Sequence, residues 1–247
     1  MSQELIVTDL TRMAAGFVCV AGYDLDGRPV RLAAPRLHEI NITTGGQPIV
    51  FPGAVVACDL LEHLPDPPHT EDYSFDPYSL RRVRRLAGAA WQAALERSLF
   101  DCVGDIFEQP IVHDNGYYIQ DGAGARSIGT IQPRGLARAT YSSSEDGTWT
   151  YRFGFFDQAG QFYRLKITDL TWNAYCESLR GPDLEPQAIA TRLTQLLKSR
   201  RVYLRIGLSR KWAKFPGRCY LQINGVYTFP DYLDGRTFAD LRPHPPA

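Results

Sequence analysis

The sequence predicts a mainly β fold with two helices, arranged as two tandem five-stranded barrels. Three observations support this prediction. The 247 residues include 21 Gly, 17 Pro and 13 Tyr, which is typical of many strands joined by turns. A hairpin-like segment occurs twice without a gap. In each half of the chain, strand-like runs precede and follow one helical pattern.

The repeated segment covers residues 20–32 and 153–165, in which Asp, Gly, Arg and Leu recur at the same offsets. Each copy has an alternating apolar run, a four-residue turn ending in Gly, and a second alternating run. This pattern predicts a β-hairpin in which Gly27 and Gly160 supply the positive φ angle of the turn. A shorter echo, Thr-Asp-Leu-Thr, begins at Thr8 and at Thr168.

The remaining elements follow in chain order. Asp76 is a candidate N-cap before Pro77, and apolar residues at helical spacing then predict a helix over residues 77–99. A second helix follows Pro186 and covers residues 186–198. Asn-Gly pairs at Asn115 and Asn224 predict tight hairpins. The predicted strands are 5–8, 17–23, 28–33, 54–61, 111–119, 126–132, 136–143, 149–156, 161–168, 202–208, 218–223 and 226–229.

Three strands, a helix and two more strands form the order of the OB-fold, a small five-stranded barrel. We therefore expect one OB-like barrel over residues 1–133, enlarged by an insertion at 34–53, and a second over residues 134–247. A single irregular β-sandwich with two helices is the alternative.

Four stretches then carry a family resemblance: residues 5–12, 68–72, 206–210 and 218–229. With these stretches, nearly the whole chain resembles the prokaryotic dual OB-containing domain family. The resemblance implies two OB barrels, and a role in sensing or binding nucleic acid in prokaryotic conflict or defence systems. It brings no catalytic residues with it.

Charge and apolar patterning restrict the class of protein. The chain has 27 Lys and Arg against 27 Asp and Glu, so attraction by the molecule's total charge is excluded as a binding mode. The balance is uneven: residues 1–80 carry 4 basic and 11 acidic side chains, and residues 181–247 carry 11 and 5. The acidic N-terminal half could meet a protein partner.

No apolar stretch is long enough for a membrane span, and the N-terminus does not resemble a signal peptide. We therefore expect a cytoplasmic protein that makes no membrane contact. The five Cys are odd in number and lack a C-x-x-C pair. We expect them to be structural thiols, with those at 19, 58 and 219 buried in apolar runs.

Searches for catalytic motifs find no G-x-S-x-G, P-loop or H-E-x-x-H pattern, and we expect a non-enzymatic protein without cofactor or bound metal. The glycines from Gly122 to Gly129 predict a flexible turn. The segment His69-Thr70-Glu71-Asp72 is the best metal or acid–base candidate, and the alternative is a solvated loop. Asp9 and Asp169 suit Asx-type turns better than a carboxylate pair.

Residues 198–218 combine eight Lys or Arg with interleaved aromatic side chains and no acidic residue. Mobile cations suit phosphates and exposed rings suit unstacked bases, so the segment predicts a site for single-stranded nucleic acid. In the alternative, Tyr203 and Phe215 pack in the core and the cations solvate a surface. The strand holding Tyr151, Phe153 and Phe155 could add a stacking face. The predicted site residues are Arg210, Lys211, Trp212, Lys214, Arg218 and Tyr220.

Three hypotheses follow for function. The first is a non-enzymatic protein whose C-terminal barrel binds DNA or RNA, in single-stranded form. The second is an adaptor or sensor that holds a partner protein or a small ligand on its barrels. The third, with the least support, is a metal-dependent hydrolase that uses the loop at residues 69–72. A second basic cluster holds Arg81, Arg82, Arg84 and Arg85, and Arg81, Arg82 and Arg85 are interpreted as the solvated face of the first helix.

Overall fold

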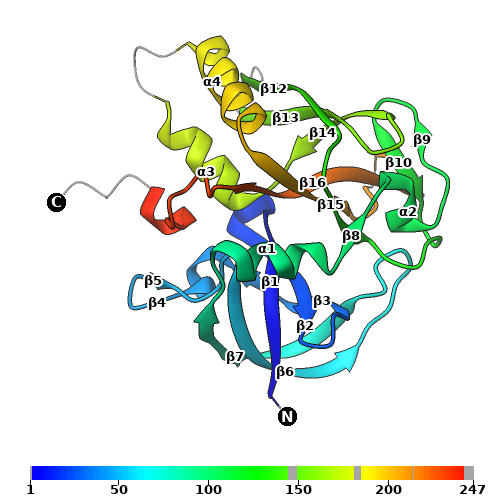
Figure 1. Ribbon diagram of the computed structural model, residues 1–247. Coiled ribbons are helices and arrows are strands. Elements are labelled where there is room, and N and C mark those ends of the chain that lie inside the picture. The colour runs from blue at the N-terminus through cyan, green and yellow to red at the C-terminus, as the bar shows by residue number, and fades with distance from the viewer. Residues whose placement is uncertain (1, 144–148, 181–184, 213, 242–247) are drawn as a thin grey trace.

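The first half of the chain folds into a closed barrel (Figure 1). The computed structural model describes residues 2–143, 149–180, 185–212 and 214–241. Five strands form the barrel in the order β1-β2-β3-β7-β6, and β6 returns to pair with β1. They are β1 (Ser2–Arg12), β2 (Phe17–Asp24), β3 (Pro29–His38), β6 (Ala54–His63) and β7 (Asp72–Arg85). This is the five-stranded Greek-key barrel of the OB-fold.

The segment between β3 and β6, where an insertion is predicted, holds short elements. These are η2 (Glu39–Ile42) and the small hairpin of β4 (Thr43–Thr44) and β5 (Gln47–Pro48). Ile42, Val50 and Phe51 from this segment are buried in the core. The insertion therefore contributes side chains to the core. A further short turn, η1 (Ala14–Gly16), joins β1 to β2.

The helix predicted over residues 77–99 is wrong in its first half. Residues 77–85 belong to β7, and the helix α1 is confined to Gly88–Glu96. Asp76 does not cap a helix, because its Oδ1 accepts the N–H of Tyr78, at 3.0 Å, within the strand. Strand β7 is the element that joins β3 to β6, and this long-range pairing overrides the local helical spacing of its apolar residues. The Arg cluster therefore lies on a strand.

The second half forms an open sheet with the same strand order, β12-β13-β14-β16-β15. Its strands are β12 (Gly135–Ser143), β13 (Trp149–Phe156), β14 (Phe162–Ile167), β15 (Arg201–Leu208) and β16 (Arg218–Phe229). Strand β14 pairs in parallel with β16, as β3 does with β7. Instead of closing onto β12, strand β15 pairs with β11 (Ile128–Ile131). The second unit is therefore an OB-type sheet, not a closed barrel.

The segment between the two units supplies further strands to the second sheet. They are β8 (Leu99–Phe100), β9 (Val112–His113) and β10 (Tyr117–Gln120), with β10 paired to β16 and β8 to β11. The short helix α2 (Val103–Phe107) lies between β8 and β9. Hydrogen bonding thus groups these elements with the second unit, while the boundary near residue 133 stays a prediction.

The repeated segments form equivalent hairpins, as predicted. In the β2–β3 hairpin, Asp24 Oδ1 accepts the N–H of Arg28 at 2.8 Å. In the β13–β14 hairpin, Asp157 Oδ1 accepts the N–H of Gln161 at 2.9 Å. Their turn glycines have φ angles of 85° and 82°. The recurring Asp and Gly therefore build the same turn at the same place in both units.

Other local predictions have mixed outcomes. The helix α4 (Pro186–Lys198) has the predicted bounds, and Asn115-Gly116 joins β9 to β10 as expected. Asn224-Gly225 does not form a hairpin, because β16 runs through it and the ladder with β15 shifts register there. The Thr-Asp-Leu-Thr echo has no structural counterpart: one copy lies inside β1 and the other leads into α3 (Leu170–Ser178).

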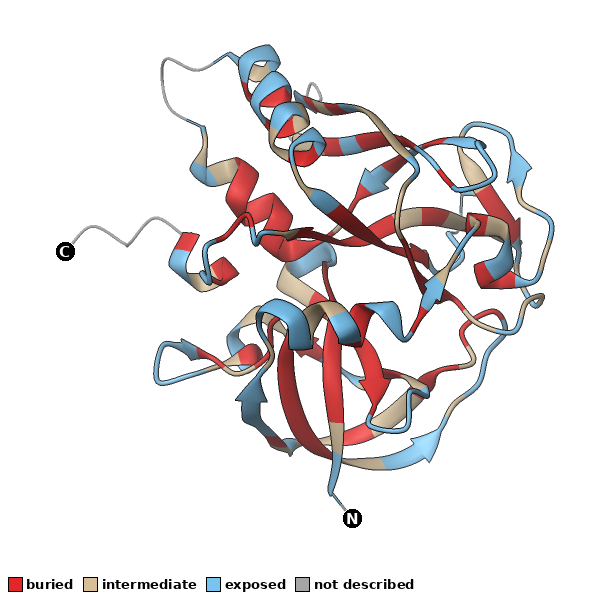
Figure 2. Cartoon of the chain, in the orientation of Figure 1, coloured by how far each residue is buried: buried red, intermediate tan, exposed pale blue. Residues whose placement is uncertain are grey.

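One hydrophobic core runs through both units, with residues such as Val56 and Phe75 from the first and Phe153 and Ile223 from the second. Figure 2 shows buried residues along α3, β16 and the inner strands of the barrel. The last described element is η3 (Phe238–Leu241), which packs on α3. Cys58 and Cys219 are buried as predicted, whereas Cys19 is half-buried. No helix of the described part of the chain is long and apolar enough to cross a membrane.

Candidate nucleic-acid interface

Most of the predicted site lies on the loop between β15 and β16, and three of its cations have carboxylate partners. Arg210 forms an ion pair with Asp72 of the first barrel. Lys211 Nζ lies 3.1 Å from Asp121, and Arg218 lies 2.9 Å from Asp114. In each pair the cation is at least partly exposed to water, so an incoming phosphate would compete with the carboxylate for it.

The aromatic members of the predicted site gather around Phe215. Trp212 is 55% exposed and meets Phe215 edge-on, with ring centroids 5.5 Å apart. Lys214 Nζ lies 5.6 Å from the centre of the Trp212 ring. Arg218 stacks 5.5 Å from Phe215, and Tyr220 contacts that ring at 6.2 Å. The fold thus brings four of the six predicted residues into one basic and aromatic rim. Their role in binding stays a prediction.

Arg205, a member of the same basic run, is fully buried. Its Nε and Nη2 donate to Asp9 Oδ2 at 3.0 and 2.8 Å, and its Nη1 donates to Tyr23 at 3.0 Å and to Thr130 at 2.8 Å. Burial opposes the charged guanidinium, but the Asp9 carboxylate outweighs it and raises the pKa of Arg205. Arg205 therefore joins the two units and is not part of the surface. Tyr203 is buried too, as the alternative interpretation expects.

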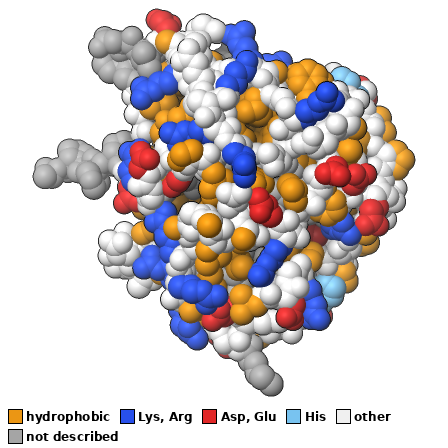
Figure 3. Space-filling view, viewed as in Figure 1, with side chains coloured by type: hydrophobic (Ala, Val, Ile, Leu, Met, Phe, Trp, Pro, Cys, Tyr) orange, Lys and Arg blue, Asp and Glu red, His pale blue; other side chains and the backbone are white. Residues whose placement is uncertain are grey.

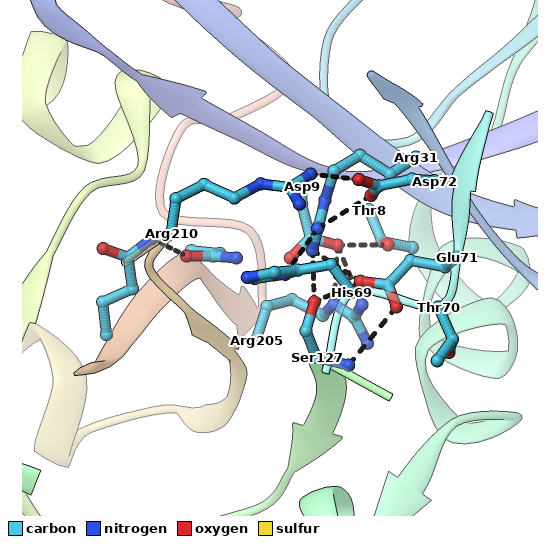
Figure 4. Close-up of polar contacts among 12 residues, drawn as sticks. Thr8, Asp9, Arg31, His69, Thr70, Glu71, Asp72, Ser127, Arg205 and Arg210 are labelled. Carbon is cyan, nitrogen blue, oxygen red and sulfur yellow. Dashed lines mark hydrogen bonds and ion pairs between the residues drawn. The ribbon is translucent and has the colours of Figure 1, made fainter. Parts of the chain in front are cut away.

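The segment at residues 69–72 is neither a solvated loop nor a metal site. His69, Glu71 and Asp72 are buried around Arg31, as Figure 4 shows. Arg31 Nη2 lies 2.6 Å from Glu71 Oε1, and Nη1 lies 3.1 Å from Asp72 Oδ1. Glu71 also accepts a hydrogen bond from the hydroxyl of Ser127, which directly precedes β11 of the second sheet. Within the described residues, no group of three or more His, Cys, Asp or Glu is placed to hold a metal ion.

His69 is held neutral inside this charge cluster. Burial, followed by the positive charges of Arg31 and Arg210, lowers the pKa of His69 to about 2. Its Nδ1 lies 2.9 Å from Arg31 Nη1, so the neutral ring accepts a hydrogen bond from the guanidinium. The cluster is thus an internal anchor of the β15–β16 loop, because Arg210 is attached to the same Asp72.

The two conspicuous Asp residues have separate roles. Asp9 lies inside β1 and pairs with Arg205, so the Asx-turn prediction is wrong for this residue. Asp169 is the N-cap of α3 and accepts the N–H of Thr171 at 2.8 Å, as the Asx-turn prediction requires. It also accepts the N–H of Val226 at 2.9 Å. Burial raises the pKa of Asp169 to about 7.

A groove of about 610 Å³ separates the first barrel from β15 and β16. Arg12, Arg36 and Arg210 line it, together with the polar side chains of Gln222 and Asn224. A groove at the junction of two units is a common place for a ligand. Apolar side chains such as Met13 and Leu32 line it as well, and of the six predicted site residues Arg210 is the one that reaches it.

The sequence prediction missed a basic patch on the outer face of β13 and β14, formed by Arg152, Arg164 and Lys166, which are all exposed. Arg152 lies opposite Lys166 in the strand register, and Arg164 is two residues away on the same face. Within the described residues, none of the three has a carboxylate within ion-pair distance. Partial burial and the charge of Arg164 lower the pKa of Arg152, as expected where cations crowd together.

The same strands correct the predicted stacking face. Tyr151, Phe153 and Phe155 point into the core and are at most 3% exposed. The exposed rings are Phe156 and Phe162, which lie side by side at one end of the basic patch with centroids 5.1 Å apart. The signal available in the sequence was the alternation of Arg164 and Lys166 with apolar residues along β14. Once the strand face that points into the core is known, this alternation indicates the basic patch.

A closed five-stranded barrel, followed by a sheet with the same strand order, defines a tandem OB-type protein. Folds of this class bind ligands on the face of the second and third strands and on the adjoining loops. The chain matches the dual OB-containing domain family over residues 4–226, nearly its whole length, and it belongs to this family. A search of curated proteins finds no match to the chain.

Proposed function

We propose that this protein is a non-enzymatic binder of single-stranded nucleic acid and that the second OB unit holds the strand. The observation that carries the proposal is the basic patch on β13 and β14. Its three cations have no carboxylate partner among the described residues and lie on the second and third strands of the unit, where OB-folds bind oligonucleotides. Such cations are available to phosphates without breaking an internal ion pair.

The patch continues into the predicted rim. Lys166 lies opposite Gln222 on β16, and Tyr220 is two residues earlier on the same face of that strand. A strand of nucleic acid could therefore pass from the basic patch, across β16, to the rim around Phe215. Exposed rings at both ends, Phe162 and Trp212, favour unstacked bases over a duplex.

The buried groups support a binding role over catalysis. His69, Glu71 and Asp72, the acid–base candidates of the sequence, are engaged with Arg31 and Arg210. A general acid or base must reach the reacting group within hydrogen-bond distance. These side chains instead hold the two units together, and the accessible chemistry is that of cations and rings.

The test measures fluorescence anisotropy of labelled dT15 and rU15 oligonucleotides over a range of salt concentrations. Each phosphate contact on a single strand contributes roughly −0.7 to the slope of log K against log salt. Combined Ala substitution of Arg152, Arg164 and Lys166 should therefore reduce the slope by about 2. The matched control replaces three exposed Arg outside the second unit, namely Arg81 and Arg84 on β7 and Arg97 directly after α1.

Equal losses in the two triple variants would refute the basic patch as the site. The loop between β15 and β16 has its own variant, Lys211→Glu with Lys214→Glu, which should weaken binding further through repulsion of phosphates. Absence of binding to both oligonucleotides at low salt would contradict the proposed function itself.

A further inference from the structure

A second pocket, of about 670 Å³, lies on the face of the molecule that bears α1. It is enclosed by the end of β7, by α1 and by the segment that follows β16 (Figure 1). Its floor contains the buried side chains of Phe51, Tyr227, Tyr232 and Leu233. Trp91 of α1 forms part of the wall. Figure 3 shows hydrophobic side chains gathered in the middle of this face, among Lys and Arg.

The size and lining of the pocket are those of a small-molecule site. Pockets for such ligands measure about 300–1,000 Å³, are mostly apolar and aromatic, and often lie where domains meet. This one collects parts of the first barrel, of α1 and of the end of the second sheet. Thr171, at the start of α3, adds a buried hydroxyl to the lining, and that hydroxyl lacks a hydrogen-bond partner among the described residues.

Two guanidinium groups border the pocket. Arg85 lies 5.2 Å from the centre of the Phe51 ring and donates to the carbonyl of Gly235 at 2.6 Å. Arg236 Nε donates to the carbonyl of Leu233 at 3.0 Å. Both Arg side chains thus contact neutral groups, and across the described ranges neither has a carboxylate within ion-pair distance.

One of the two acids of the lining segment, Asp231, is occupied by its own turn. Asp231 accepts the N–H of Leu233 at 3.0 Å on one oxygen and the N–H of Gly235 at 2.9 Å on the other. Its carboxylate is thereby directed at backbone donors. The guanidinium groups of Arg85 and Arg236 can turn toward a ligand, and the exposed carboxylate of Asp234 lines the same border.

From this arrangement we infer that the pocket binds a small planar aromatic anion of the nucleoside monophosphate class. The heterocyclic ring packs against the wall that contains Trp91, and the phosphate binds the guanidinium groups of Arg85 and Arg236. The site is separate from the basic patch on β13 and β14, whose cations do not line the pocket. It is therefore independent of the proposed oligonucleotide binding.

Calorimetric titration of the full chain with AMP, GMP, CMP and UMP, each alone, tests this inference. At least one should bind, and the corresponding nucleoside should bind at least tenfold more weakly because it lacks the phosphate. Arg85→Ala and Arg236→Ala should each lower the affinity about tenfold. Arg84→Ala is the matched control, because Arg84 neighbours Arg85 on β7 but does not line the pocket.

Three outcomes would overturn the inference: no binding of any of the four monophosphates at millimolar concentration, equal affinities in the Arg84 and Arg85 variants, or loss of binding in the triple variant of the basic patch. The last result would assign the monophosphate to the oligonucleotide face. Melting temperatures of all variants show whether the exposed substitutions leave the fold intact.

Discussion

The buried ion pair between Asp9 and Arg205 gives the sharpest test of how the two units are joined. In Asp9→Asn the shape of the side chain is kept and the negative charge is lost. The guanidinium of Arg205 is fully buried and remains charged, because an Arg side chain keeps its proton in proteins. Removing one partner of a buried pair costs about 3–5 kcal/mol, because the other charge is left uncompensated.

Three further hydrogen-bond acceptors of Arg205 limit the loss of unfolding free energy to this range. Tyr23, Ser98 and Thr130 still receive hydrogen bonds from its Nη1, at 2.8–3.2 Å. They cannot replace the contacts of Nε and Nη2 with Asp9. The unfolding free energy should therefore fall by about 3–5 kcal/mol, a large part of the 5–15 kcal/mol of an ordinary protein.

Urea titration followed by fluorescence and circular dichroism measures the change. The control is Glu4→Gln, which breaks the exposed pair between Glu4 and Arg84, at 2.7 Å, and should cost about 0–1 kcal/mol. A combined Asp9→Leu and Arg205→Met variant should be more stable than Asp9→Asn alone, because both charges are gone. If Asp9→Asn costs no more than Glu4→Gln, the pair does not join the units as argued.

Three more predictions concern titration and close packing. The pKa of Asp169 is raised to about 7, so the folded state binds an extra proton between about pH 4 and 7. As the pH falls through this range, the unfolding free energy of the wild type, measured by urea titration, should rise by up to about 1.4 kcal/mol per pH unit relative to that of Asp169→Asn. The pKa of His69 is lowered to about 2, so below pH 6.5 the unfolded state binds a proton that the folded state does not. The unfolding free energy of the wild type should therefore fall by a similar amount per pH unit relative to that of His69→Gln. For either residue, parallel curves of unfolding free energy against pH for wild type and variant would contradict the assigned pKa. Gly22→Ala should cost about 3 kcal/mol, because a Cβ there would lie 1.9 Å from the carbonyl oxygen of Ile6, whereas Gly160→Ala should cost about 1–2 kcal/mol from its φ of 82° alone; equal melting temperatures would refute the contrast.

Features that depend on a few neighbouring residues were predictable from the sequence. The paired hairpins follow from an Asp that accepts a turn N–H and a Gly at positive φ, both fixed within five residues. The helix that begins at Pro186 has its signal in its first turn and in its apolar stripe. By contrast, residues 77–85 belong to a strand because residues 81–85 pair with residues 54–57 of β6. These partners lie 24–31 residues away in sequence and are invisible to local spacing.

The candidate site was predictable in part for the same reason. The rim around Phe215 is one continuous stretch of sequence, so its cations and rings could be recognised together. Arg205 belongs to that stretch but lies on the inner side of β15, and composition cannot tell an inner cation from an outer one. The basic patch is split between β13 and β14, and its members meet only when Arg152 and Lys166 come into register.

The uneven charge of the sequence has a structural origin in the contact between the two units. Asp9 and Asp72 of the acidic first half pair with Arg205 and Arg210 of the basic second half. Two OB-type units in contact need such complementary charges where charged groups are buried. The cations without a carboxylate partner among the described residues are therefore the ones available to an anionic ligand. Among them, the patch containing Arg152 occupies the strand face on which an OB unit binds its ligand.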